Sequence, residues 1–312
     1  PPGNEPLDEF HLAARLSYFL WNTMPDDELL AAASANSLRN NLASHVKRML
    51  GDERSRSLAR NFGSQWLGTR RLQDVHPDAQ LFPEFDEALR AAMRTEAEML
   101  LHHVQRHDLP ITALLDADFT FVNRRLAEHY DLPAPASDDF TRTELPDRRR
   151  GGIVTLAGVL TVTSHPDRTS PVERGKWIMG QLLGEAPPPP PPGVDVLPEG
   201  DAAALTGTMR ERMQRHREDP SCISCHQVMD PLGFALENYD AIGRWREQEG
   251  DQPIDNTGQL PDGRKFQGAA GLRELLLAEK ATFRRTLIEK LLTYALGRGL
   301  EYYDQCAVDE IA

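Results

Sequence analysis

The sequence predicts a mainly α-helical protein, in which a helical lobe is followed by a second helical body with a small β-hairpin. Three observations support this fold class. Apolar residues recur at spacings of three and four over most of the chain, as they do along one face of a helix. Proline and acidic residues stand where helices would begin, and glycines where they would end. The segment Ile254 to Gly263 has hairpin chemistry, with Asp262-Gly263 at the turn.

Composition sets limits on the class of protein. The 312 residues suggest two or three domains, and a hydrophobic fraction of 40% is enough for a real core. The formal charge is -13, which argues against a nucleic-acid partner because such proteins present a basic face. No stretch approaches the run of about 20 apolar residues that crosses a bilayer, so no transmembrane segment is expected.

Residues 1–132 are expected to form an N-terminal helical domain. A helix should begin after Pro25, where three acidic residues fill the first turn. The longest helix is predicted from Glu84 to His107, and a shorter one from Val122 to Tyr130. Residues 133–139 are rich in Pro, Ala, Ser and Asp and therefore mark a boundary.

Three histidines near the end of the longest helix need an interpretation. His102, His103 and His107 could suggest a metal site, since residues four apart share a helix face. No carboxylate or cysteine completes a convincing ligand set. We therefore favour an amphipathic helix that carries histidines on its polar edge.

A middle domain is expected over residues 140–246. The apolar run from Ile153 to Thr163 fits either a helix or a strand, because periodicity alone does not decide between them. Ser170, followed by Pro171, is typical of a helix start, and this helix should end at Gly184.

Six prolines, Pro187 to Pro192, follow that helix. Such a run forms the extended polyproline helix, and we interpret it as a stiff strap between elements. A charged helix is expected from about Ala203 to Arg217. The strap would hold the middle and last domains together as one body, with the first third as a separate lobe.

The last domain, residues 247–312, should contain the hairpin and two closing helices. These helices are predicted from Gly271 to Ala278 and from Thr282 to Leu296. Gly297 is a plausible stop signal for the second of them.

The segment Cys222-Ile-Ser-Cys225-His226 carries the strongest chemical signal. Two cysteines at this spacing, followed at once by histidine, are the attachment signature of a c-type haem. Each thiol adds to one haem vinyl group, and the imidazole becomes an axial ligand of the iron. The remaining cysteine, Cys306, is distant and single, which excludes a disulfide framework and leaves a four-ligand zinc site incomplete. We expect one covalent haem c in a cytochrome c-like helical body; half of a zinc site and a chance match remain the alternatives.

Covalent haem attachment occurs outside the bacterial cytoplasm, so the protein is expected to be exported to the periplasm or cell envelope. The first residues, Pro1 to Asn4, lack the charged and apolar regions of a signal peptide. The chain is therefore interpreted as a piece of a longer exported protein.

The second axial position would decide what the haem does. His226 should bind on the proximal face, and Met229 lies three residues later, on the same side of a helix. A distal ligand must therefore come from elsewhere. The candidates are His216, Met213, Met209, Met179 and His165.

Two charged or titratable residues are candidate haem contacts. His216 could bind the iron, contact a haem propionate or cap its helix. Arg168 could stand over the haem as a charge stabiliser, or form a buried structural ion pair with an acid.

Four stretches resemble a known group of proteins. They are Leu16 to Trp21 with Met24 to Asp26, Arg168 to Trp177, Cys222 to Arg246, and Tyr294 to Asp304. Together they resemble exported, planctomycete-type bacterial proteins, cytochrome-like in character and built from the fused domains of unknown function 1592, 1588 and 1585. Proteins of this group often carry a further cytochrome-like module upstream. The resemblance therefore implies that such a module is a partner of this chain.

The expected function is redox chemistry, with electrons passing between a substrate-handling module and a periplasmic carrier. One alternative is a peroxidase or oxidase whose distal position is open or displaceable. The similarity of Arg168 to Pro171 to the Arg-Thr-Pro segments of di-haem peroxidases favours it. Another is a module that binds a polysaccharide or a partner protein, with haem as a structural staple. A carbohydrate-related substrate therefore stays under consideration.

Overall fold

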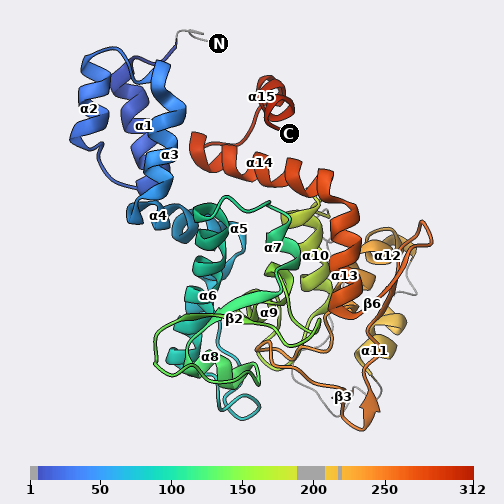
Figure 1. Cartoon of the computed structure of the whole chain (residues 1–312). Coiled ribbons are helices and arrows are strands. Elements are labelled where there is room, and N and C mark those ends of the chain that lie inside the picture. Colours follow the sequence, from blue (N-terminus) through green and yellow to red (C-terminus); the bar gives the residue numbers. More distant parts are fainter. Residues whose placement is uncertain (1–5, 188–207, 217–219) are drawn as a thin grey trace.

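The computed structural model describes residues 6–187, 208–216 and 220–312, and it is mainly helical (Figure 1). For residues 212, 214–216 and 220–225 the description is limited to the backbone. The longer helices are α1 (Glu9–Trp21), α2 (Asp27–Ser34), α3 (Leu42–Gly51), α6 (Glu87–Arg106), α8 (Arg124–His129), α9 (Ala157–Val162), α10 (Pro171–Leu182), α11 (Met209–His216), α12 (Pro220–Phe234), α13 (Gly268–Ala278), α14 (Lys280–Leu296) and α15 (Gln305–Ile311). Short helical turns include α4 (Arg56–Leu58), η3 (Ala59–Gly63), α5 (Ser64–Trp66) and α7 (Ala113–Asp116).

The strands form two-stranded antiparallel sheets, of which the last two are hairpins. They are β1 (Phe119–Val122) with β2 (Thr141–Glu144), β3 (Gln248–Glu249) with β4 (Gln252–Pro253), and β5 (Thr257–Gln259) with β6 (Lys265–Gln267). The last pair is the hairpin expected around Asp262-Gly263, and Gly263 has the left-handed φ of 90° that such a turn needs. The other two sheets were not predicted.

Helix starts follow the expected capping chemistry. The carboxylates of Asp26 and Asp86 accept hydrogen bonds from the N–H groups of Leu29 (3.1 Å) and Leu89 (2.7 Å). Ser170 Oγ accepts from the N–H of Glu173 at 3.2 Å, so the predicted start of α10 is confirmed.

One predicted helix begins later than expected. Val122 is the last residue of β1, where it pairs with Thr141, and α8 starts only at Arg124. The side chain of Asn123 makes the break, because it accepts a hydrogen bond from the N–H of Leu126 at 3.0 Å.

The ambiguous run from Ile153 to Thr163 is helical. It consists of a 3-10 turn, Ile153–Thr155, followed by α9. Every residue of α9 is buried. A helix that is buried on all sides has no amphipathic pattern, which is why its periodicity was uninformative.

Within the described residues, the main hydrophobic core joins elements that are far apart in the chain. It includes residues from Ala13 in α1 to Phe283 in α14. Helices α1 to α3 project from the body in Figure 1, whereas α6 contacts α9 and α7 contacts α13. Helices α6 and α7 of the first third thus share the core of the later elements, and the separate lobe stays a prediction. The domain limits themselves stay a prediction.

Helices α10 and α12 are packed backbone to backbone. A Cβ atom on Gly175 would lie 1.8 Å from the carbonyl oxygen of Met229, and one on Gly233 would lie 1.9 Å from that of Pro171. The two contacts pair the residues in opposite chain order, so the helices run antiparallel. Glycine is required at both positions because any side chain would collide with a main-chain atom.

We predict that Gly175→Ala lowers the free energy of unfolding by at least about 2 kcal/mol, because the added methyl group must push two helices apart. Urea denaturation followed by circular dichroism measures this. Gly299→Ala is the control, since a Cβ there meets no atom within 4 Å and the change should be nearly neutral. Equal stability of the two variants would contradict the close packing.

Candidate functional site

Helix α12 carries the cysteine-histidine motif. Cys222, Cys225 and His226 occupy positions i, i+3 and i+4 of this helix, a spacing that groups residues on one helical face. The cysteine side chains lie outside the described residues. Their attachment to haem therefore stays a prediction.

The imidazole of His226 is held by a carboxylate on the same helix. Its Nδ1 lies 2.9 Å from Oδ1 of Asp230. The His226 side chain is 16% exposed and that of Asp230 is completely buried. An ionised carboxylate only accepts hydrogen bonds, so Nδ1 is the nitrogen that would donate to it, and Nε2 is the nitrogen left for a metal.

This arrangement fits an axial ligand. Histidines that bind metals commonly donate the proton of their other ring nitrogen to a carboxylate, which fixes the ring and raises its basicity as a ligand. His226 has this partner, and it directly follows the two thiols that would hold a haem. The donor set of α12 is thus chemically suited to haem c.

The candidates for the distal side are spread over several elements. Met209 and Met213 in α11 form a small buried cluster with Phe234 and Val172. Met179 and Met229 both belong to the main core. Met229 lies where α12 contacts Gly175 of α10.

The two candidate histidines differ in what is described. His165 precedes α10, and its backbone N–H donates to the carbonyl of Arg168 at 2.9 Å. The side chain of His216 lies outside the described residues. The distal ligand and the exclusion of Met229 therefore stay predictions.

Arg168 forms an ion pair with its neighbour. Its Nη1 lies 3.0 Å from Oδ1 of Asp167, and its side chain is mostly buried. The side chain of Asp167 is 37% exposed, so this ion pair is only partly buried. A contact between Arg168 and haem remains a prediction.

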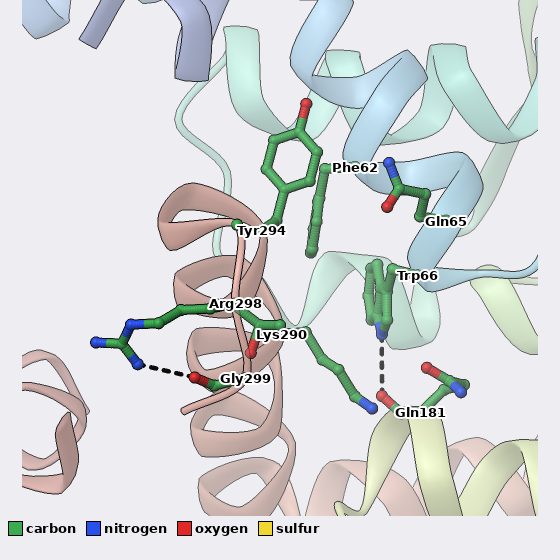
Figure 2. A pocket seen from close by; sticks show the side chains of 10 residues that line it. Phe62, Gln65, Trp66, Gln181, Lys290, Tyr294, Arg298 and Gly299 are labelled. Carbon is green, nitrogen blue, oxygen red and sulfur yellow. Dashed lines mark hydrogen bonds between the residues drawn. The ribbon is translucent and has the colours of Figure 1, made fainter. Parts of the chain in front are cut away.

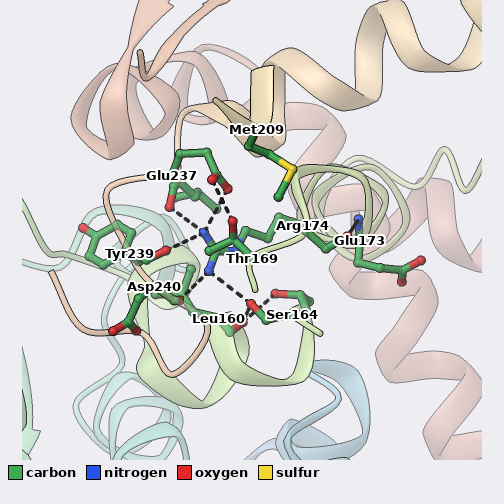
Figure 3. Close-up of polar contacts among 12 residues, drawn as sticks. Leu160, Ser164, Thr169, Glu173, Arg174, Met209, Glu237, Tyr239 and Asp240 are labelled. Carbon is green, nitrogen blue, oxygen red and sulfur yellow. Dashed lines mark hydrogen bonds and ion pairs between the residues drawn. The ribbon is translucent and has the colours of Figure 1, made fainter. Parts of the chain in front are cut away.

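A polar centre beside α12 is built around Arg174 and was not predicted from the sequence (Figure 3). The Arg174 side chain is 0% exposed, and its Nη1 lies 3.4 Å from Oε1 of Glu237. The guanidinium also donates to the carbonyls of Leu236 (2.7 Å), Tyr239 (2.9 Å) and Asp240 (2.7 Å), and to Ser164 Oγ (3.2 Å). It thereby joins α10 to the segment that follows α12.

The carboxylate of Glu237 has hydrogen-bond donors besides Arg174. It accepts from Thr169 Oγ1 at 2.7 Å and from Arg246 Nη2 at 3.2 Å. Burial raises the pKa of Glu237, while the positive charges of Arg174 and Arg246 lower it. Burial lowers the pKa of Arg174 to about 10, which still leaves the guanidinium protonated at neutral pH.

A sequence signal for this pair existed. Arg174 stands four residues before Ile178 and eight before Leu182, so it lies on the apolar face of its helix. A charge on a buried face requires a buried partner. Glu237, directly after an apolar run, was a plausible one.

The histidines of α6 make ring contacts. The centroid of His103 lies 4.3 Å from that of His107 and 5.1 Å from that of Phe119. Burial lowers the pKa of His102 and of His103. Within the described parts of the chain, no group of three His, Cys, Asp or Glu side chains is placed to hold a metal ion.

We predict that Glu237→Gln lowers the free energy of unfolding by about 3 kcal/mol, because it leaves the Arg174 charge buried without its counterion. Chemical denaturation at neutral pH measures the change. Glu279→Gln is the matched control: Glu279 pairs with Arg264 at 2.7 Å on the surface, where an ion pair contributes at most about 1 kcal/mol. Similar losses in both variants would show that the buried pair has no special role.

Three families match the chain in succession. Each is described as a protein of unknown function: DUF1592 over residues 7–132, DUF1588 over residues 150–249 and DUF1585 over residues 262–312. No curated protein and no solved structure matches the chain. None of the helices in the described residues combines the length and apolar character of a membrane span. The chain belongs to the proteins in which the domains DUF1592, DUF1588 and DUF1585 follow one another.

Proposed function

We propose that this protein is an exported c-type haem protein that transfers electrons. Cys222 and Cys225 would hold one haem covalently, and His226 Nε2 would be its axial ligand. The contact between His226 Nδ1 and the buried Asp230 carboxylate is the observation that supports this best. When bound, the haem supplies one-electron redox chemistry.

Asp230 has a defined part in this proposal. Its carboxylate orients the imidazole and fixes the proton on Nδ1. A negative charge next to the ligand also favours the oxidised, more positive iron, so it lowers the reduction potential.

The surroundings of α12 suit such a ligand. The glycine contacts with α10 and the Arg174–Glu237 pair hold the helix and the segment after it. A ligand on a rigid element keeps its geometry in both oxidation states. The net charge of -13 would suit a basic periplasmic partner, and an upstream cytochrome domain is the other partner we propose.

We predict that the protein, made in a host with haem-attachment machinery, exceeds the mass of the chain by one haem. Intact mass spectrometry measures this. Cys222→Ala combined with Cys225→Ala should abolish the covalent haem, because both thioether bonds are lost. Cys306→Ala, which changes an exposed free cysteine, should keep it. An unmodified mass, with zinc found instead, would refute the proposed function.

We also predict that Asp230→Asn raises the reduction potential of the attached haem. The expected shift is on the order of 60 mV, which is a tenfold change in a one-electron equilibrium constant. Redox titration followed by absorption measures it. Asp240→Asn is the control, since this largely buried acid accepts from the N–H groups of Ile242 (2.9 Å) and Arg244 (2.8 Å) and has no hydrogen bond to His226. Equal reduction potentials in the two variants would show that Asp230 does not influence the haem through His226.

The same contact favours a second function, that of a peroxidase. A carboxylate partner makes the imidazole of His226 a stronger electron donor, and a haem held by such a ligand would supply peroxidase chemistry. Peroxide distinguishes the two functions: an electron-transfer protein with both axial positions filled keeps its absorption spectrum, whereas a peroxidase changes it within seconds.

A further inference from the structure

A cleft of about 690 Å³ opens where three distant parts of the chain meet (Figure 2). Phe62 and Trp66 come from η3 and α5, Gln181 from the end of α10, and Lys290 and Tyr294 from α14. The volume is within the range of small-molecule sites.

Each of the three matched domains contributes to this cleft. Trp66 lies in the DUF1592 region, Gln181 in the DUF1588 region and Lys290 in the DUF1585 region. The junction of domains is a common place for ligand sites. No single domain of this chain contains the whole set.

The aromatic wall of the cleft is fixed by packing. The rings of Phe62 and Trp66 are stacked with centroids 5.7 Å apart, and Tyr294 is tilted against Phe62 at 5.7 Å. The indole N–H of Trp66 donates to the carbonyl of Gln181 at 3.0 Å. Phe62 and Trp66 are only 8% and 4% exposed, so they offer an occupant narrow ring edges.

Polar groups are accessible in the cleft beside its aromatic wall. The amides of Gln65 and Gln181 can each donate and accept hydrogen bonds. Burial raises the pKa of Tyr294, partly offset by the nearby positive charge of Arg70, so its hydroxyl stays a donor at neutral pH. These groups suit a ligand with many hydroxyls.

The cleft also carries positive charge. Lys290 extends along it toward α10 in Figure 2 and forms no ion pair with any residue in the described ranges. Arg298 at the rim differs, because its guanidinium is bound by Asp304 at 2.7 and 3.0 Å. In a chain with 48 acidic and 35 basic residues, a lysine without a counterion in a cleft points to an anionic ligand.

We propose that this cleft binds an anionic oligosaccharide. The sugar rings would lie against the edges of Trp66 and Tyr294, their hydroxyls would bond to the amides of Gln65 and Gln181, and a carboxylate or sulfate group would pair with Lys290. This site does not depend on haem, because none of its lining residues belongs to α12.

Isothermal titration calorimetry of the full chain tests the site with three probes. They are trigalacturonate, which carries carboxylates, a sulfated galactan disaccharide, and neutral maltotriose. At least one anionic probe should bind at least tenfold more tightly than maltotriose. Whether trigalacturonate or the sulfated disaccharide binds shows whether the site prefers a carboxylate or a sulfate group. Lys290→Gln should weaken that binding at least tenfold, and Tyr294→Phe several-fold.

Lys280→Gln is the matched control, because it removes the same charge at the first residue of α14. This variant should bind the probes like the unmodified protein. Thermal unfolding shows that the variants are folded. The proposal is overturned if neither anionic probe binds at millimolar concentration, if maltotriose binds equally well, or if Lys290→Gln binds unchanged. Preparations with and without haem should give the same result, so a failure of the redox proposal leaves this test intact.

Discussion

The guanidinium of Arg174 lies completely inside the protein, so the surrounding chain must supply the partners that water would otherwise provide. Glu237 supplies the opposite charge, and three backbone carbonyls of the same segment supply acceptors. A charge buried in this way tolerates little movement of its partners, because each lost contact leaves it unsolvated. The course of the chain from the end of α12 to Asp240 is thus fixed against α10. The direction of α12, and with it the position of His226, depends on this arrangement.

Much of the helical fold could be predicted because its signals are local. Asp26, Asp86 and Ser170 mark helix starts through bonds that span three residues, and the sequence displays them directly. Strand β1 was missed because its pairing with Thr141 to Glu144 is not local. The packing of α6 against α9 was missed for a similar reason: α9 is buried all round and has no polar face to define its orientation.

The two candidate sites differed in how far the sequence revealed them. The motif from Cys222 to His226 is contiguous, and the position of Asp230 four residues later follows from helical geometry once α12 is recognised. The cleft is assembled from residues more than 200 positions apart, such as Trp66 and Lys290, so no pattern within a segment indicates it. Helix α10 links the two sites, since Gly175 contacts α12 and Gln181, six residues later, lines the cleft.

The close approach of α10 and α12 also constrains how the protein is made. With the carbonyls of Met229 and Pro171 lying against Gly175 and Gly233, there is no space for α12 to pivot once it has docked. If haem is attached to Cys222 and Cys225, as we propose, the attaching enzyme works on a chain whose α12 has not yet docked, or from the side of the helix turned away from α10. In the first case biosynthesis would have an order: the modification would come first, and the glycine contacts would then close behind it.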